Sequence, residues 1–162
     1  MQVFIEIPCV RIATRADEPD LLELCRMYHA ESSEGVFSED KARDIMRRSF
    51  TPASNAPAII GVAGEKRIEG SICVEVATPA LSDTPFLQIL WHFVRPESRK
   101  SPYGKDLLTF AKSLAAPAPI GIGLKLQANA LVTQRTAQMY NRALGEPRAQ
   151  AWLYDATPAE AV

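Results

Sequence analysis

The sequence predicts a single α/β (α+β) domain in which helices cover both faces of a mixed β-sheet. In the middle of the chain, segments of alternating apolar and polar residues follow one another, which is typical of an antiparallel meander. Further on, strands alternate with helices, which is typical of crossovers and of a parallel strand pair. With 162 residues, 47% hydrophobic and 23% charged, the chain has the size and composition of one globular domain with its own core.

Two amphipathic helices are predicted in the first third of the chain. Asp17 is suited to the N-cap of the first helix and Pro19 to its first turn, and apolar residues at helical spacing continue it to about Glu31. Ser38 stands ahead of two acids, a pattern that predicts the start of the second helix. Serine, glycine and proline follow each helix and predict the loops that end them.

Strands and two further helices are predicted in the rest of the chain. The helix at Tyr103–Ala115 has leucine and alanine along one face, and the helix at Thr133–Leu144 stops at Gly145, a residue suited to a C′ position. Segments rich in β-branched, aromatic and alternating residues indicate the strands. The expected strands are 10–13, 58–63, 68–78, 86–94, 120–126 and 149–154, with a further candidate at 3–7.

Charge and composition exclude several classes of protein. The net charge of −1 provides no basic field for nucleic acid. No apolar run approaches the roughly 20 residues of a membrane span, and the first residues lack the basic region of a signal peptide. We therefore expect a cytoplasmic protein with neither nucleic acid nor membrane as a partner.

The three cysteines, Cys9, Cys25 and Cys73, are far apart in the sequence. An odd number without close spacing argues against a disulfide framework and against a zinc site, so we expect buried free thiols and no metal. Residues 10–155 are expected to form the domain, with 1–9 as an extension or extra strand and 156–162 as a frayed tail.

One segment has the features of a phosphate-binding turn. The strand at 86–94 enters a polar loop that contains Arg99 and Gly104, and the loop leads directly into the helix that begins at Tyr103. A helix N-terminus offers unpaired N–H groups and the positive end of the helix dipole, which together hold phosphate without a metal. Arg99 and Lys100 add positive charge. In isolation such a pair is more typical of a solvated turn, but its place between a strand and a helix start favours phosphate binding.

This turn resembles the coenzyme A signature of the GCN5-related N-acetyltransferase family. That signature has Arg or Gln, two residues, Gly, one residue, and then Gly or Ala, between the fourth strand and the next helix. The chain has Arg99-Lys-Ser-Pro102-Tyr-Gly104 there, with proline at the first glycine position. A second segment, Asn129 after a strand followed by Tyr140-Asn-Arg-Ala-Leu-Gly at a helix end, is similar to the family's C-terminal pattern.

The resemblance implies a mostly antiparallel sheet with a splayed parallel strand pair, and an activity. The activity is transfer of an acetyl group from acetyl-CoA to a primary amine of a small molecule or protein, by direct transfer in a ternary complex. Homodimers are common in the family. The residues implied to bind the cofactor are Phe93, Val94, Arg99, Lys100, Ser101, Tyr103, Gly104, Lys105 and Asn129.

Three residues are candidates for catalysis. By resemblance, Tyr140 lies near the thioester sulfur, where a phenol can protonate the leaving thiolate. His92 and Glu75 lie on expected central strands, where alternation can direct them into a cleft, and they are the candidate bases. The alternative for His92 and Glu75 is an ordinary hydrogen-bonded strand residue, and for Tyr140 it is an aromatic residue of the core or its boundary.

The alternative function is a degenerate binding module that has the same fold and binds coenzyme A weakly or not at all. Pro102 favours it, because proline has no N–H to offer a phosphate. The acyl acceptor is left open by the sequence, since residues 31–57, expected to line the acceptor site, carry mixed charge.

Overall fold

The computed structural model describes residues 7–32, 35–51, 58–116, 125–128 and 134–146. Their strands form one sheet in the order β1-β2-β3-β4-β5, antiparallel from β1 to β4 and parallel between β4 and β5. The elements are β1 (Val10–Ile12), α1 (Glu18–Ser32), α2 (Glu39–Phe50), β2 (Ala58–Ala63), β3 (Gly70–Ala77), β4 (Phe86–Val94), α3 (Tyr103–Ala115), β5 (Lys125–Ala128) and α4 (Gln134–Leu144), with short 3-10 turns η1 (Arg15–Asp17) and η2 (Pro96–Ser98).

The parallel pairing of β4 with β5 confirms the central prediction for the fold. The two strands pair from Phe86 opposite Lys125 to Ile89 opposite Ala128, and α3 connects them as the predicted crossover helix. The expected splay beyond Ala128, the strand at 149–154 and the extra strand up to residue 6 lie outside the described residues.

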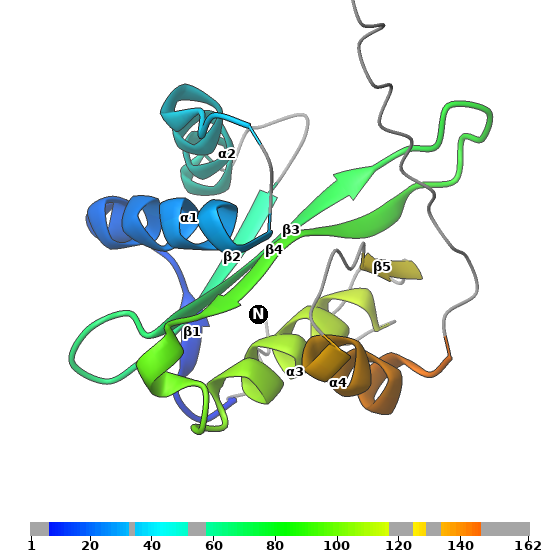
Figure 1. Ribbon diagram of the computed structural model, residues 1–162. Coiled ribbons are helices and arrows are strands. Elements are labelled where there is room, and N and C mark those ends of the chain that lie inside the picture. The colour runs from blue at the N-terminus through cyan, green and yellow to red at the C-terminus, as the bar shows by residue number, and fades with distance from the viewer. Residues whose placement is uncertain (1–6, 33–34, 52–57, 117–124, 129–133, 147–162) are drawn as a thin grey trace, which may run out of the picture.

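The helices form a layer on each side of the sheet (Figure 1). The helices α1 and α2 cover one face, and α3 and α4 cover the other. Each face has its own hydrophobic core. Leu24 and Met46 are among the fully buried side chains on the α1–α2 side, and Leu107 and Leu108 are among those on the α3 side.

A β-bulge in β4 exchanges the faces of its side chains. On β3, Cys73 and Val74 are adjacent, but their partners on β4 are Trp91 and Ile89, so Leu90 is the extra residue. As a result Ile89 packs in the α3 core, whereas Trp91 packs in the α1–α2 core. An unbroken alternation along β4 would instead place these two side chains on one face.

The first helix begins differently from the prediction. Thr14, not Asp17, is the capping residue, and it starts η1, which leads directly into α1. The Asp17 carboxylate accepts a hydrogen bond from the Thr14 N–H at 2.7 Å and two from the Arg11 guanidinium. These contacts, with Arg11 the larger cause, lower the pKa of Asp17 to about 2. Ser38 does cap α2 as predicted, accepting from the Lys41 N–H.

The cysteines are only partly as expected. Cys25 and Cys73 are buried free thiols, but Cys9 is exposed, which corrects the prediction, and its backbone has a positive φ of 66°. Burial raises the pKa of Cys25 to about 12 and also raises that of Cys73. Both buried thiols are therefore protonated near neutral pH and lack the thiolate that a nucleophile needs.

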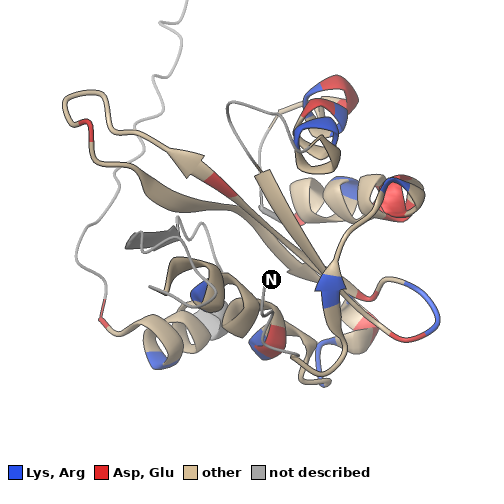
Figure 2. Ribbon diagram, turned by 180° about the vertical axis from the view of Figure 1, so that it is seen from behind, with Lys and Arg blue, Asp and Glu red and all other residues tan. Residues whose placement is uncertain are grey.

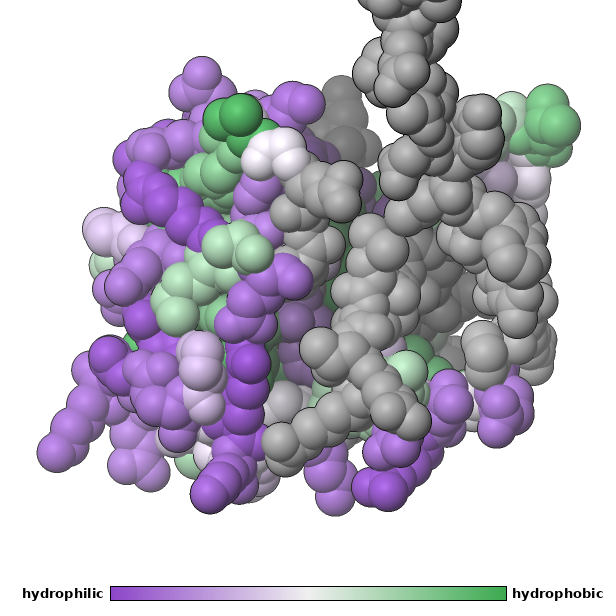
Figure 3. Space-filling model, viewed as in Figure 1, coloured by the Kyte–Doolittle hydropathy of each residue, from purple (hydrophilic) through white to green (hydrophobic). Residues whose placement is uncertain are grey.

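Charged residues of both signs are interleaved on the surface that the structure describes. Figure 2 shows them mainly on the helices and turns, while β3 and β4 carry few. Hydrophilic side chains make up most of the coloured surface in Figure 3. Green patches lie among them, one of them at the tip of the β3–β4 hairpin, where Leu81 is fully exposed. Within the described ranges, the helices are too short or too polar to cross a membrane.

Gly61 provides a test of how closely α3 packs on the sheet. A methyl group at Gly61 would lie 2.7 Å from the Phe110 ring and 3.3 Å from Ile72 Cγ2. Gly61→Ala should lower the free energy of unfolding by about 1–3 kcal/mol, because α3 must move away from β2 to make room. Urea denaturation measures the change.

Gly104→Ala is the matched control for that prediction. Its added methyl would be 3.7 Å from the nearest atoms, an ordinary contact distance, and Gly104 lies within α3. We expect it to leave stability unchanged or to raise it by about 0.5–1 kcal/mol. Equal stability of Gly61→Ala and the wild type would contradict the tight packing.

Candidate functional site

The turn between β4 and α3 has the predicted form. Pro96 opens η2, and Pro102 occupies the N-cap of α3 with φ −74° and ψ −5°. The first turn of α3, starting at Tyr103, has N–H groups without intrahelical partners and the positive end of the helix dipole. The helix terminus that phosphate binding at Arg99–Lys105 would require is therefore present.

Ser101 shapes this turn by internal hydrogen bonds. Its N–H donates to Ser98 O at 3.0 Å, and its hydroxyl donates to the same oxygen at 2.6 Å. The Ser101 Oγ also accepts from the Tyr103 N–H at 3.4 Å. Together with the missing N–H of Pro102, these contacts leave Gly104 and Lys105 as the main amide donors at the start of α3.

Arg99 is held toward α1. Its Nη2 lies 2.5 Å from Glu31 Oε2, its Nε donates to Val94 O at 3.1 Å, and its guanidinium lies 5.4 Å from the Phe93 ring centroid. Glu31 therefore neutralises part of the charge that was expected to face a phosphate, a contact that sequence reasoning did not find. Lys100 and Lys105 are exposed and make no ion pair with any described residue.

Arg95 anchors the base of the turn. It is 5% exposed, its Nε donates to Ile68 O at 3.0 Å, and its Nη2 lies 2.7 Å from Glu23 Oε2 on α1. The Ser98 hydroxyl donates a further hydrogen bond to Glu69 Oε2 at 2.7 Å. The turn is thus fixed to α1 and to the β2–β3 connection, an arrangement that the sequence did not reveal.

His92 and Tyr140 form a contact on the α3 side of the sheet. His92 Nδ1 lies 3.1 Å from the Tyr140 hydroxyl oxygen, and their ring centroids are 5.8 Å apart. Burial lowers the pKa of His92 to about 4, with the Gly104 backbone opposing part of the shift. Burial, and to a smaller degree Tyr28, raises the pKa of Tyr140 above its ordinary value. Both side chains are therefore neutral near pH 7.

The turn between β4 and α3 lies directly beside this pair. The Cβ position of Gly104 is 3.7 Å from Val94 and Met139 side-chain atoms and 4.0 Å from His92 Nε2. Of the described β5 residues, none pairs with β4 beyond Ile89, so Leu90–Val94 has an edge with no strand partner described. The turn, this edge of β4 and the His92–Tyr140 pair thus adjoin one another.

Glu75 lies on the opposite face of the sheet. It follows Val74, which packs in the α3 core, so its side chain is on the α1–α2 side, where its Oε2 is 3.1 Å from Arg48 Nη1. Glu75 and His92 were expected to point into a cleft, and the bulge in β4 places them on different faces. The two candidate bases therefore do not form one cluster.

Of two further residues near the site in sequence, Trp91 and Asn129, only Trp91 lies in the described part of the chain. Trp91 is a core residue whose Nε1–H donates to Ser71 Oγ at 3.1 Å, so its indole is satisfied inside the protein. Asn129, predicted to bind the cofactor, lies outside the described residues.

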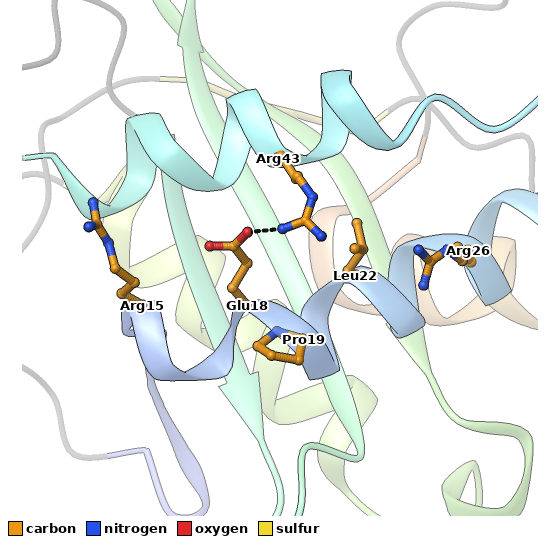
Figure 4. A pocket seen from close by; sticks show the side chains of 6 residues that line it. All are labelled: Arg15, Glu18, Pro19, Leu22, Arg26 and Arg43. Atoms are coloured by element: carbon orange, nitrogen blue, oxygen red, sulfur yellow. Dashed lines mark hydrogen bonds and ion pairs between the residues drawn. The ribbon is translucent and has the colours of Figure 1, made fainter.

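A shallow depression of about 430 Å³ lies between the start of α1 and α2 (Figure 4). Arg43 reaches across it to Glu18, and it also binds Glu39 at 2.8 Å. The depression is on the α1–α2 side of the sheet, away from the His92–Tyr140 pair, and so is not part of the same site. Its lining residues are Arg15, Glu18, Pro19, Leu22, Arg26 and Arg43.

Comparisons with known proteins find similarity in structure. No protein-family model matches the chain, and no curated protein matches it in sequence. An integron cassette protein from the mobile metagenome of Cole Harbour Salt Marsh has a TM-score of 0.69 at 20% identity, over 94% of this chain and 92% of that one. A probable acetyltransferase has a TM-score of 0.65 at 17% identity, over 94% and 98% of the two chains.

A third solved structure is an enzyme whose name gives its acceptor. The ribosomal-protein-alanine N-acetyltransferase from Brucella melitensis biovar Abortus 2308 has a TM-score of 0.64 at 14% identity, over 91% of this chain and 99% of that one. At these identities the three matches establish a shared fold over nearly the whole chain.

Proposed function

We propose that this chain, which has the fold of the GCN5-related N-acetyltransferases, is an acyltransferase that moves the acetyl group of acetyl-CoA to a primary amine. The observation that carries the proposal is the juxtaposition of three features on the α3 side of the sheet. They are the N-terminus of α3, the edge of β4 after Ile89, and the His92–Tyr140 pair.

The residues around the turn fit the parts of coenzyme A. The first turn of α3 suits a pyrophosphate, with amide donors at Gly104 and Lys105 and the exposed positive charges of Lys100 and Lys105 close by. The backbone of Leu90–Val94 suits the amides of an extended chain, because strand edges pair with such groups. Release of Arg99 from Glu31 would add a further cation.

Acetyl-CoA would supply an activated thioester. The residues of the protein would position the two reactants and protonate the leaving sulfur. With acetyl-CoA bound, the amine nitrogen would form its bond to the acetyl carbon as the carbon–sulfur bond breaks. The Tyr140 hydroxyl would give its proton to the sulfur, and the proton that the new amide nitrogen loses would return to Tyr140 through water. Holding both reactants in line accounts for much of the rate in such reactions. We propose that a neutral amine attacks, because His92, with a pKa of about 4 and Nδ1 engaged by Tyr140, is a weak proton acceptor.

Acceptors named for structural neighbours are chemically diverse and share an amine. One neighbour was solved with the aminoglycoside sisomicin, and others are named for ribosomal-protein alanine and for glucosamine-6-phosphate. For this chain we propose only the shared class, a primary amine on a small molecule or peptide. Thiol release measured with a panel of amines would identify which of these acceptors the protein uses.

Coenzyme A binding tests the proposal directly. At about 100 times its dissociation constant, acetyl-CoA should stabilise the protein by about 2.7 kcal/mol, seen as a rise in melting temperature. Arg99→Glu should remove most of this rise, because it replaces a cation beside the turn with an anion and leaves Glu31 unpaired.

Two variants control for general charge effects. Lys41→Glu makes the same change of charge on an exposed residue of α2 and should keep the full rise in melting temperature. Glu31→Gln frees Arg99 and should strengthen binding. If acetyl-CoA neither binds nor is cleaved by the wild type with any amine of a broad panel, the degenerate binding module becomes the better assignment.

A further inference from the structure

The guanidinium of Arg99 lies in surroundings that suit a cation. It is 5.4 Å from the centroid of the Phe93 ring, within the range of a cation–π contact. Its Nη2 lies 2.5 Å from Glu31 Oε2 on α1, and its Nε donates to Val94 O at 3.1 Å. The Tyr28 ring packs edge to face with the Phe93 ring, with 6.3 Å between the centroids. A carboxylate, a carbonyl oxygen and an aromatic ring thus contact one positive charge.

The Arg99–Glu31 pair is exchangeable, unlike the pair made by the neighbouring Arg95. Arg95 is 5% exposed and is fixed to Glu23 and to Ile68 O, so it serves the structure of the turn. The side chains of Arg99 and Glu31 are 41% and 45% exposed. An ion pair with this exposure contributes at most about fivefold to an equilibrium constant, so a competing anion can draw Arg99 away from Glu31.

We propose that Glu31, Phe93 and Tyr28 form a subsite for a second, non-reacting cationic group of the acyl acceptor. Arg99 fills this subsite in the structure and leaves it when its guanidinium turns to the pyrophosphate of acetyl-CoA. The inference rests on the proposed function and narrows its substrate class, from any primary amine to one that also carries an ammonium or guanidinium group. Cofactor and acceptor then bind with positive coupling, because the first empties the place that the second takes.

The subsite adjoins the reacting groups across the edge of β4. Phe93 follows His92 on the strand, and His92 contacts Tyr140. Burial and, to a smaller degree, an electrostatic interaction with Tyr28 raise the pKa of Tyr140, although the two phenols come from helices on opposite faces. Among the described residues, no strand pairs with Leu90–Val94 on the β5 side and separates them. A short acceptor held at the subsite by one end can therefore present its other end toward Tyr140.

A second contact of a cation with an aromatic ring and a carboxylate, also on α1, provides a matched control. The Arg26 guanidinium lies 5.9 Å from the Phe37 ring centroid, and its Nη2 lies 2.5 Å from Glu39 Oε2. Glu39 also binds Arg43 at 2.8 Å, so removal of Arg26 leaves that carboxylate paired. Arg99→Ala, in contrast, leaves the carboxylate of the subsite without a cation in the described part of the chain.

Titration with a small cation tests the subsite without any turnover. Arg99→Ala empties the subsite, so ethylguanidinium should bind this variant about fivefold more tightly than the wild type, in which Arg99 competes. The amide shifts of Phe93 and Val94 in ¹⁵N-labelled protein at low salt measure the binding. Addition of Glu31→Gln to Arg99→Ala should abolish the gain, and Arg26→Ala should bind no better than the wild type. No gain in Arg99→Ala, a gain that survives Glu31→Gln, or an equal gain in Arg26→Ala overturns the subsite.

A comparison of two acceptors tests the role of the subsite in the reaction. 1,4-Diaminobutane and butylamine share the reacting amine and differ in the second ammonium group. At saturating acetyl-CoA, Glu31→Gln should raise the KM for the diamine about fivefold to tenfold, the loss expected for one partly exposed charged contact. The kcat and the KM for butylamine should stay near those of the wild type. Equal changes of KM for the two amines, or no change for either, overturn the role in recognition.

The two experiments separate this inference from the proposed function. If no amine of a broad panel gives thiol release, the proposed function fails, and the titration still supports or overturns the cation subsite. If turnover is normal but Arg99→Ala shows no gain in ethylguanidinium binding, the subsite is overturned and the proposed function stands.

Discussion

Tyr140→Phe should lower turnover by about 10²–10⁴-fold, the usual contribution of general acid catalysis, while acetyl-CoA affinity changes little. Phenylalanine keeps the ring that packs in the α3 core but removes the hydroxyl proton and the 3.1 Å contact with His92. The measurement is a thiol-release assay with a panel of amines, combined with isothermal titration of acetyl-CoA.

Met139→Leu is the control for that substitution. Met139 precedes Tyr140 on α4, is partly buried against the same core, and is close in volume to leucine, so turnover should stay near that of the wild type. Loss of the His92 contact alone should cost Tyr140→Phe about 0.5–1.5 kcal/mol in stability. Normal turnover in Tyr140→Phe would remove Tyr140 from the mechanism.

Acid should destabilise the protein through His92. The pKa of His92 is about 4 in the folded protein, against about 6.5 for an ordinary histidine. Between these values the unfolded chain binds a proton that the folded protein does not, so stability rises with pH and is lost as pH falls. At about 1.36 kcal/mol per pKa unit, the free energy of unfolding should fall by about 3 kcal/mol from pH 7 to pH 4 through this one group.

Urea denaturation at several pH values measures this loss. His92→Asn should remove most of the slope between pH 7 and pH 4, whereas His29→Asn should retain it. The Asp17 carboxyl acts in a lower window, since its pKa of about 2 means that its contribution persists until the pH falls below the ordinary value near 4. An equal slope in His92→Asn and the wild type would contradict the low pKa of His92.

Most of the secondary structure was predictable because it depends on local patterns. Short runs of apolar residues predicted β2 and β4 with the bounds observed, and helical spacing predicted α3 at Tyr103–Ala115. The turn between β4 and α3 was predictable for the same reason, since a strand, a polar loop and a helix start are consecutive in the chain. Asp17 was misassigned because Thr14 and Asp17 both have the residue type of a cap, and only the geometry of η1 distinguishes them.

The sequence by itself determined the fold class, the place of the turn and the identity of His92 and Tyr140 as candidates, because each is a property of residues near one another in the chain. The tertiary structure decided which candidates meet. The bulge at Leu90 moved Trp91 into the other core and placed His92 on the opposite face of the sheet from Glu75. The fold also brought His92 into contact with Tyr140, which lies 48 positions further along the chain. A bulge adds one residue on one strand relative to its partner, so it depends on the pairing of two strands and cannot be read from the sequence of either strand alone.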